Sequence, residues 1–350
     1  STSTDPLDNS GASNGAVYVF TRSGAAWQQQ AYLKASVTDP HDAFGTSLAL
    51  SADGLTLAIG VPNEDSTSTD PLDNSGASNG AVYVFTRSGA AWQQQAYLKA
   101  FVTDQNDSFG TSLALSADGQ TLVVGAPGED SSSTDPLDNS GSANGAVHVF
   151  TRSGAAWQQE AYLKASVPGS HDRFGTSLAL SADGLSLVVG APGEDSTSAD
   201  PLDNSGSDNG AVHVFTRSGA TWQQEAFLKA SVPDSNDRFG ISLALSADGQ
   251  TLAIGAPGER SAGTDPLDNS GGAYCGAAYI FRRSGATWQQ QAFLKASVPD
   301  ANDYFGVGLA LSADGLTLAV GANQESSIAT GIGGDANDDS AQSSGAAYLF

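Results

Sequence analysis

The sequence predicts an all-β protein, a β-propeller of four-stranded antiparallel blades, on three observations. A motif with a Phe-Gly pair recurs every 65 residues, and after 66 at the last step, which marks a repeat architecture. Each repeat reads as four short strands separated by Gly-rich turns, with no convincing helix. One tryptophan recurs per repeat, as expected of a side chain that packs between sheets. Sheets of this kind pack radially as blades, whereas a β-solenoid has shorter coils and no regular tryptophan. The recurring residues are Phe44, Phe109, Phe174, Phe239 and Phe305, and Trp27, Trp92, Trp157, Trp222 and Trp288.

Residues 109–165 show how one repeat is divided. The predicted strands are residues 112–115, 122–124, 146–150 and 157–165. Asp118 and Gly119 tolerate positive φ, so they form a hairpin turn between the first two strands. The first strand is small and apolar, and the fourth is rich in Gln, Lys and Tyr. We therefore expect the first strand to be central and the fourth to be a polar outer edge. Period-2 alternation in the fourth strand predicts Trp157, Gln159, Ala161 and Leu163 on one face, and Gln158, Glu160, Tyr162 and Lys164 on the other.

Repeats that share one core count as a single body, so we expect one propeller domain over residues 1–350. The approximate repeats are 1–43 (partial), 44–108, 109–173, 174–238, 239–304 and 305–350 (partial). Residues 27–35 could supply the fourth strand of the last blade, which would close about five blades. The chain contains no methionine, even at position 1, so we expect a processed product or a fragment, and a fragment allows six or seven blades.

Charge limits the partners of the protein. With 38 acidic and 14 basic residues, the formal net charge is −24. Such a chain should repel nucleic acid and anionic membranes and attract cations. No apolar run approaches the roughly 18 residues of a membrane helix, so membrane insertion is not expected. Cys275 is the single cysteine, cannot form an intramolecular disulfide, and is expected to be buried or incidental.

Two sequence motifs carry a family resemblance. Asp-x-Phe-Gly is followed by Gly-Ala-Pro-Gly at 125–128, 190–193 and 255–258, and the pair resembles the FG-GAP repeat of integrin α-subunits and their bacterial relatives. Gly-Ala-Val-Tyr-Val-Phe at 15–20 and 80–85 is similar to the third strand of the bacterial members. The resemblance implies a secreted or cell-surface propeller used in adhesion or assembly.

The chain departs from this pattern in two ways. The second unit reads Gly60-Val61-Pro62-Asn63 and the last reads Gly321-Ala322-Asn323-Gln324. Integrin repeats often carry an Asp-rich calcium loop between the first two strands, but here that place holds only Ser-Ala-Asp-Gly. One carboxylate cannot supply the six to eight oxygens that calcium takes, so the family's calcium site is not carried over.

The long loop between the second and third strands contains paired acids, which are the weak calcium candidates of the chain. With Glu129 and Asp130 nearby, one loop could collect several oxygens for calcium. The favoured interpretation is an ordinary acidic loop, in which Asp and Asn form turns and cap backbone N–H groups. The pairs are Asp70 and Asp73, Asp135 and Asp138, Asp200 and Asp203, and Asp265 and Asp268.

A second recurring carboxylate precedes each Phe-Gly pair. It should hold a turn before the inner strand by accepting hydrogen bonds from backbone amides, and metal binding there is the less favoured interpretation. Its copies are Asp42, Asp107, Asp172, Asp237 and Asp303.

No residue pattern predicts catalysis, because no Ser-His-Asp or metal-ligand spacing emerges. His148 and His213 replace a strand tyrosine of sister repeats, and His41 and His171 lie in variable connectors. The arginines of the Thr-Arg-Ser-Gly turn should be solvated or paired with acidic loops; they are Arg22, Arg87, Arg152 and Arg217.

The near-identity of the repeats favours a multivalent surface over a catalytic centre. Residues 1–35, for example, match residues 66–100 at every position. The sequence therefore predicts a non-enzymatic, secreted or cell-surface propeller that binds a protein or surface glycan. The alternative is a structural subunit that self-associates into an extracellular filament through its terminal strands. A propeller hydrolase or lyase is less favoured.

Overall fold

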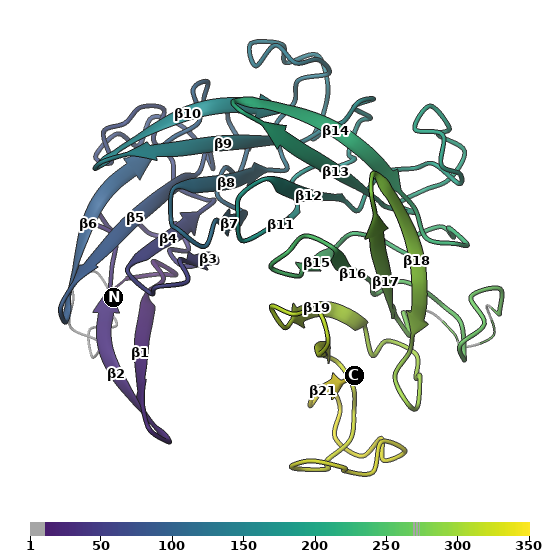
Figure 1. The fold of residues 1–350 in the computed structure, drawn as a ribbon. Coiled ribbons are helices and arrows are strands. Elements are labelled where there is room, and N and C mark those ends of the chain that lie inside the picture. Colours follow the sequence, from purple (N-terminus) through teal and green to yellow (C-terminus); the bar gives the residue numbers. More distant parts are fainter. Residues whose placement is uncertain (1–10, 269, 271, 273) are drawn as a thin grey trace. The chain divides into compact units, whose positions relative to one another are not determined.

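A computed structural model describes residues 11–268, 270, 272 and 274–350 (Figure 1). It divides into two compact units, Ser1–Lys164 and Ala165–Phe350, and each is described by itself. Within the described residues every regular element is a β-strand, which confirms the all-β fold class. No helix of this part of the chain is long and apolar enough to cross a membrane. The first ten residues of the predicted terminal segment lie outside the described residues, and its role in assembly stays a prediction.

The first unit contains three antiparallel sheets. The first has two strands, β1 (Val17–Ser23) and β2 (Ala26–Leu33). The second has the order β3 (Ser47–Leu50), β4 (Thr56–Val61), β5 (Ala81–Ser88), β6 (Ala91–Leu98). The third has the order β7 (Ser112–Leu115), β8 (Thr121–Ala126), β9 (Ala146–Ser153), β10 (Ala156–Leu163).

The second unit repeats the same topology. One sheet has the order β11 (Ser177–Leu180), β12 (Ser186–Ala191), β13 (Ala211–Ser218), β14 (Thr221–Leu228). The next has the order β15 (Ser242–Leu245), β16 (Thr251–Ala256), β17 (Ala277–Ser284), β18 (Thr287–Leu294). The last has three strands, β19 (Phe305–Leu311), β20 (Leu318–Ala322) and β21 (Ala346–Leu349).

Each complete sheet therefore runs from first to fourth strand in chain order, which confirms the predicted blade. The first strand lies at one edge and the polar fourth strand at the other, as β7 and β10 show in Figure 1. The predicted hairpin turn is also present. The Oδ1 of Asp118 accepts hydrogen bonds from Ser116 Oγ and Gln120 N, and Gly119 adopts a φ of 66°.

One prediction for the fourth strand is wrong. The register between β9 and β10 shifts between Gln159 and Ala161, because Gln159 lies opposite Phe150 while Ala161 lies opposite Val149. Glu160 is the extra residue of this β-bulge, and a bulge exchanges the two faces of a strand beyond it. The predicted alternation is therefore interrupted after Gln159. Lys164, which was expected on one face with Gln158, Glu160 and Tyr162, lies just beyond β10 and is buried.

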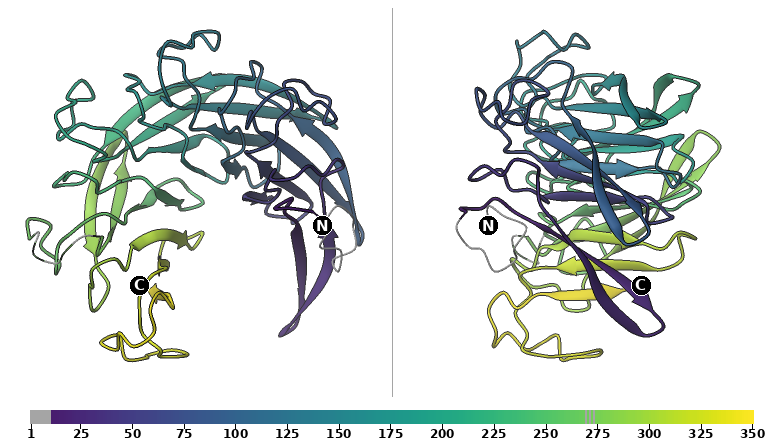
Figure 2. Two further views of the ribbon diagram at one scale, coloured as in Figure 1. Left: turned by 180° about the vertical axis from the view of Figure 1, so that it is seen from behind. Right: turned by 90° about the vertical axis from the view of Figure 1, so that its left-hand side faces the viewer.

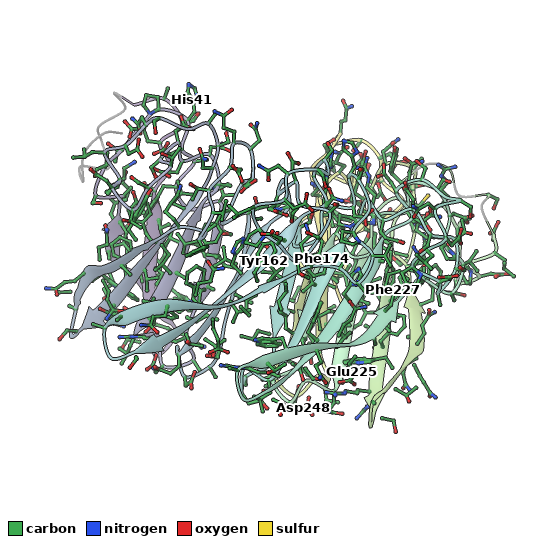
Figure 3. The ribbon with its side chains drawn as sticks, turned by 90° about the horizontal axis from the view of Figure 1, so that it is seen from above. His41, Tyr162, Phe174, Glu225, Phe227 and Asp248 are labelled. Atoms are coloured by element: carbon green, nitrogen blue, oxygen red, sulfur yellow. The ribbon has the colours of Figure 1, made fainter. Side chains whose placement is uncertain are left out.

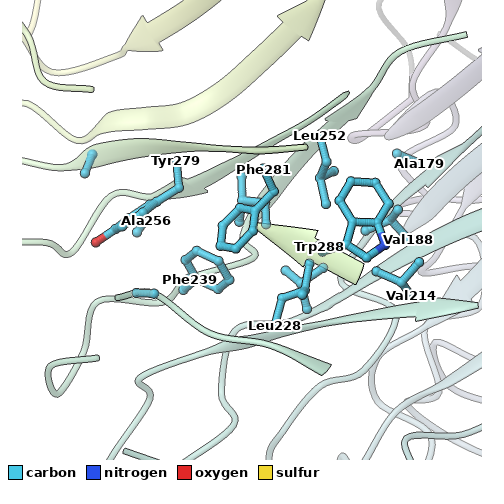
Figure 4. Close-up of a cluster of buried hydrophobic side chains, with 14 residues drawn as sticks. Ala179, Val188, Val214, Leu228, Phe239, Leu252, Ala256, Tyr279, Phe281 and Trp288 are labelled. Carbon is cyan, nitrogen blue, oxygen red and sulfur yellow. The ribbon is translucent and has the colours of Figure 1, made fainter. Parts of the chain in front are cut away.

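Consecutive sheets within a unit pack through apolar side chains, and tryptophan joins this packing in most repeats. Trp288 is 8% exposed and belongs to a cluster with Val188 and Val214 of the preceding sheet and with Phe239 (Figure 4). Trp222 is also buried, while Trp92 and Trp157 are partly buried against apolar clusters. The prediction of a buried tryptophan fails for Trp27, which is 66% exposed. Trp27 lies in β2, and no described sheet precedes β1 and β2 to cover it.

The Phe-Gly and Gly-Ala-Pro motifs meet between neighbouring sheets. The carbonyl oxygen of Gly110, which lies two residues before β7, accepts a hydrogen bond of 2.7 Å from Ser47 Oγ of the preceding sheet. A Cβ atom added to Gly60 of β4 would lie 2.1 Å from that same carbonyl oxygen. Gly190 and Gly240, and Gly255 and Gly306, repeat this approach in the second unit. The glycines are therefore required because two backbones touch between sheets.

Candidate functional site: the long loops between the second and third strands

The long loops lie at the same end of each sheet as the connectors to the next repeat. Antiparallel topology places them there, and backbone hydrogen bonds join the two segments: Asn106 N donates to Ala77 O and Phe109 N donates to Asn79 O. Figure 3 shows His41, in such a connector, among the loops at the upper edge of the first unit. In the second unit Asp248, in a short hairpin turn, lies at the lower edge.

Each of four loops presents an exposed leucine at the same position of the sequence Asp-Pro-Leu-Asp. The exposed fractions are 73% for Leu72 and 74% for each of Leu137, Leu202 and Leu267. Loop 64–80 also contains three aspartates in addition to Glu64 and no basic residue. The surface around Leu72 is therefore an apolar tip in an acidic surrounding. The sequence could have indicated this exposed leucine. It recurs with the same period as the strands, but the residues around it show no strand-like alternation of apolar and polar side chains.

The predicted calcium candidates close these loops by hydrogen bonds to their own chain. Asp70 Oδ1 accepts from Leu72 N at 3.0 Å, which forms the turn under the leucine. Asp73 Oδ1 accepts from Ser75 N, and its Oδ2 accepts from Thr67 N and Oγ1, which ties the two sides of the loop together. The turn under the leucine is repeated at Asp135, Asp200 and Asp265. The hydrogen bond from the N–H of the serine two positions later is repeated at Asp138, Asp203 and Asp268. These aspartates form the turns that the favoured interpretation expects, and calcium binding by the loops stays untested.

These bonds also set the ionisation of the second aspartate. Hydroxyl donors, Ser75 first and then Ser68 and Thr67, hold the pKa of Asp73 well below its usual range. The pKa values of Asp138, Asp203 and Asp268 are lowered by the corresponding serines. The carboxylates are thus ionised and already satisfied by protein donors. Within the described residues no group of three or more His, Cys, Asp or Glu side chains is arranged to hold a metal ion.

A buried ion pair lies beneath each complete loop, and it was not predicted. Lys164 Nζ lies 2.7 Å from Glu129 Oε2, with the two side chains 1% and 7% exposed. Lys99 pairs in the same way with Glu64 and also donates to Gly80 O, where the loop rejoins β5. The remaining pairs are Lys229 with Glu194 and Lys295 with Glu259. Glu129, considered above as a calcium ligand, is therefore engaged by lysine, and the pair anchors the loop to the fourth strand.

The aspartate before each Phe-Gly pair holds a turn, as predicted. Asp107 Oδ2 accepts from Asp104 N at 3.1 Å, and the other four copies accept from the residue three positions earlier. Burial raises the pKa of Asp107 to about 8, and nearby Glu129 adds to the effect. Burial likewise raises the pKa of Asp42, Asp172 and Asp237 to about 7 and of Asp303 to about 6. These carboxyl groups are structural, and burial shifts their titration toward neutral pH.

The histidines occupy the places predicted for them. His148 lies inside β9 with its ring between those of Phe109 and Tyr162, and burial lowers its pKa to about 4. His213 has the same position in β13, and burial lowers its pKa to about 4 as well. Both are therefore neutral at physiological pH. His41 and His171 lie in connectors, where they adopt φ values of 75° and 68°.

Two further sequence expectations concern Cys275 and the turn arginines. Cys275 is buried, as predicted, and burial raises the pKa of its thiol. The arginines Arg22, Arg87, Arg152 and Arg217 were expected to be solvated or paired with acidic loops, but Arg152 reaches the neighbouring sheet. Arg152 Nη1 donates to Thr56 Oγ1 of the preceding sheet at 3.2 Å. Arg283, at the equivalent position two repeats later, pairs with Glu225, which lies on a fourth strand and not on a loop.

Comparison with known proteins decides the family. A model of the FG-GAP repeat matches residues 27–85, 92–150, 157–215, 222–281 and 288–350. The chain belongs to the FG-GAP repeat family. The FG-GAP fold here is a β-propeller, and each of the five matched repeats contains the first three strands of one sheet, from β3–β5 to β19–β21. The two-stranded sheet of β1 and β2 is additional to these five sheets.

Solved structures of other proteins share this fold at low sequence identity. The periplasmic gluconolactonase PpgL of Pseudomonas aeruginosa is 19% identical, with a TM-score of 0.55 over 88% of this chain and 72% of that protein. A Lactobacillus plantarum protein is 15% identical, with a TM-score of 0.51 over 85% of this chain and 67% of that one. Kuenenia stuttgartiensis hydrazine synthase is 16% identical, with a TM-score of 0.50 over 89% and 72%. These similarities concern the fold alone. No curated protein matches the sequence.

Proposed function

We propose that this FG-GAP chain is a non-enzymatic binding module of the cell surface or extracellular space, which adheres to a protein partner through its leucine-tipped loops. The observation that carries the proposal is the repetition of one exposed leucine, about 74% exposed, on four loops of the same construction. A side chain of that size gains about 1.5–3 kcal/mol when it is fully buried by a partner. Several weak contacts on one chain then combine into a strong attachment.

The construction of the loops supports a role in binding. The aspartate bonds close each loop before any partner arrives, and the buried lysine–glutamate pair fixes its base, so little conformational entropy is lost on contact. Asp70 and Asp73 surround Leu72 with negative charge and no basic residue lies in that loop. The partner that fits this surface has apolar depressions bordered by basic side chains.

A bead-adhesion experiment tests the proposal. Beads coated with the full chain are applied to an array of extracellular proteins that spans acidic, neutral and basic isoelectric points. We expect adhesion to basic members of the array. Replacement of the four loop leucines by serine should abolish it: Leu72→Ser, Leu137→Ser, Leu202→Ser and Leu267→Ser. A single replacement should weaken adhesion only partly, because the other loops remain.

A matched control uses leucines that are exposed at the opposite end of the sheets. Leu55, Leu185 and Leu316 lie in or beside the hairpin turns and are 44%, 47% and 76% exposed. Their replacement by serine removes exposed apolar area at the end away from the loops and should leave adhesion unchanged. If the loop variant adheres as well as the parent chain, or if beads of the parent chain adhere to no member of the array, the proposal is wrong.

A further inference from the structure

A cavity of about 380 Å³ lies between the sheets β3–β6 and β7–β10 of the first unit. It is formed by the hairpin turns and by the turns between third and fourth strands, so it lies at the end opposite the long loops. Its size falls within the range of about 300–1,000 Å³ that is usual for small-molecule sites. Its polar lining residues are Asp53, Thr56, Thr86, Arg87, Asp118, Gln120 and Arg152.

Two guanidinium groups line this cavity without a carboxylate partner. Within the described residues Arg152 donates from Nε to Gly154 O and from Nη1 to Thr56 Oγ1, and it lies 5.9 Å from the ring of Trp157. Arg87 donates from Nε to Gly89 O. Neither side chain has an acidic oxygen within 4.0 Å among these residues, although the formal net charge of the chain is −24. Two arginines in one cavity, neither in direct contact with a carboxylate, can bind an anionic group of a ligand.

The second unit shows what a neutralised arginine looks like in the same position. Arg283 donates from Nη1 to Ser186 Oγ, as Arg152 does to Thr56, but its Nη2 also forms an ion pair with Glu225. The residue equivalent to Glu225 in the first unit is Gln95, which instead accepts from Trp157 Nε1. The presence of glutamine at position 95, where the second unit has glutamate, therefore leaves the guanidinium group of Arg152 available to a ligand.

The acidic groups of the cavity define the rest of the ligand. Asp53 Oδ1 accepts from Ser51 Oγ and Leu55 N, and Asp118 Oδ1 accepts from Ser116 Oγ and Gln120 N. Within the described residues the Oδ2 atoms of Asp53 and Asp118 accept no hydrogen bond. They are acceptors that need O–H or N–H donors, whereas the arginines need a negatively charged acceptor. A complementary ligand thus carries one anionic group and several hydroxyl groups.

We propose that this cavity binds an acidic saccharide, with the carboxylate of a uronate sugar between Arg87 and Arg152 and its hydroxyl groups on Asp53 and Asp118. A planar carboxylate matches the fork of a guanidinium group, and ring hydroxyls are the donors that a carboxylate of the protein accepts. Sulfate and hydrogen phosphate fit less well, because they bring more negative charge against two aspartates and few or no donors. The site is independent of the loops to which adhesion is assigned.

Isothermal titration of the full chain tests the proposal. The probes are D-glucuronate, D-galacturonate, D-glucose, sodium sulfate and glycine. We expect a uronate to bind at least tenfold more tightly than glucose, sulfate or glycine. Glucose binding equal to glucuronate would remove the role of the arginines and overturn the proposal. Sulfate or glycine binding as tight as the uronates would assign the cavity to simple oxyanions or to zwitterions, and either result would also overturn it.

A substitution copied from the sister repeat tests the position of the site. Gln95→Glu supplies Arg152 with the carboxylate that Arg283 already has, so it should weaken uronate binding at least tenfold while the thermal unfolding midpoint is retained. Glu225→Gln is the matched control, since it changes the same side chain in the second unit and should leave binding in the first cavity unchanged. Arg87→Ala removes the second guanidinium group of the cavity and should also weaken uronate binding. Undiminished uronate binding in both Gln95→Glu and Arg87→Ala would overturn the assignment.

Discussion

The buried ion pair beneath the loops makes a strong prediction about stability. Lys164→Met removes the ammonium group that lies 2.7 Å from Glu129 Oε2 and keeps most of the apolar length of the side chain. Both side chains are less than a tenth exposed, so the remaining carboxylate would be left without a counter-ion and without water. Removal of one partner from a buried pair costs about 3–5 kcal/mol. For a unit the size of residues 1–164, the unfolding midpoint should fall by roughly 6–20 °C.

Urea unfolding followed by tryptophan fluorescence and circular dichroism measures the effect. The double variant Lys164→Met with Glu129→Gln removes both charges, and we expect it to recover most of the loss, because paired removal of a buried ion pair is often neutral. Arg22→Met is the control, since Arg22 is exposed and donates from Nε to Gly24 O, and it should change stability by less than about 0.5 kcal/mol. A loss below about 1 kcal/mol for Lys164→Met, or a double variant less stable than the single one, would refute the reasoning.

Three further predictions follow from other parts of the structure. His148 has a pKa of about 4 in the folded protein and 6.5 in the unfolded chain, so its burial lowers the free energy of unfolding as pH falls from about 6.5 to 4. His148→Tyr, which introduces the residue of sister repeats, should raise the free energy of unfolding by about 2 kcal/mol at pH 5 and by little at pH 8. An equal gain at both pH values would contradict this prediction. Gly60→Ala places a Cβ atom 2.1 Å from Gly110 O and should cost at least 1–3 kcal/mol, whereas Gly263→Ala, with open space around it, should be tolerated. EDTA and added calcium should leave the melting temperature unchanged; a calcium-dependent rise that Asp135→Asn with Asp138→Asn abolishes would show that the loops bind the ion.

Sequence patterns were sufficient for the fold because the repeat supplies the same information five times. The strand order, the hairpin turn at Asp118 and Gly119, and the capping role of Asp107 all follow from local chemistry that is visible in a single repeat. The alternation in β10 was predicted wrongly because a bulge depends on the partner strand. Neither Gln159 nor Ala161 signals by type that the register changes between them.

The contents of the site were harder to predict, since they depend on contacts between distant segments. Lys164 and Glu129 are 35 residues apart. Lys164 directly follows a strand rich in Gln and Tyr, and nothing near it in the sequence indicates an acidic partner. A usable signal existed, because the two opposite charges recur at the same separation in successive repeats. Arg152 also looked like a surface residue, and its contact with Thr56 spans 96 positions. The exposed Leu72 recurs once per repeat in the long loops, and the strand patterns do not account for its recurrence.

The geometry separates the residues that define the family from those that can define the function of this chain. Gly60 and Gly110 touch across neighbouring sheets, and Ser47 bonds to the same carbonyl oxygen, so the Phe-Gly and Gly-Ala-Pro motifs fix how one blade lies on the next. Substitution there damages the scaffold and reports nothing about binding. Functional variation must therefore lie where repeats differ or where side chains leave the sheets. Gln95, which is replaced by glutamate in a sister repeat, and Leu72, which projects from its loop, are positions of that kind. The saccharide proposal rests on Gln95 and the adhesion proposal on Leu72 for this reason.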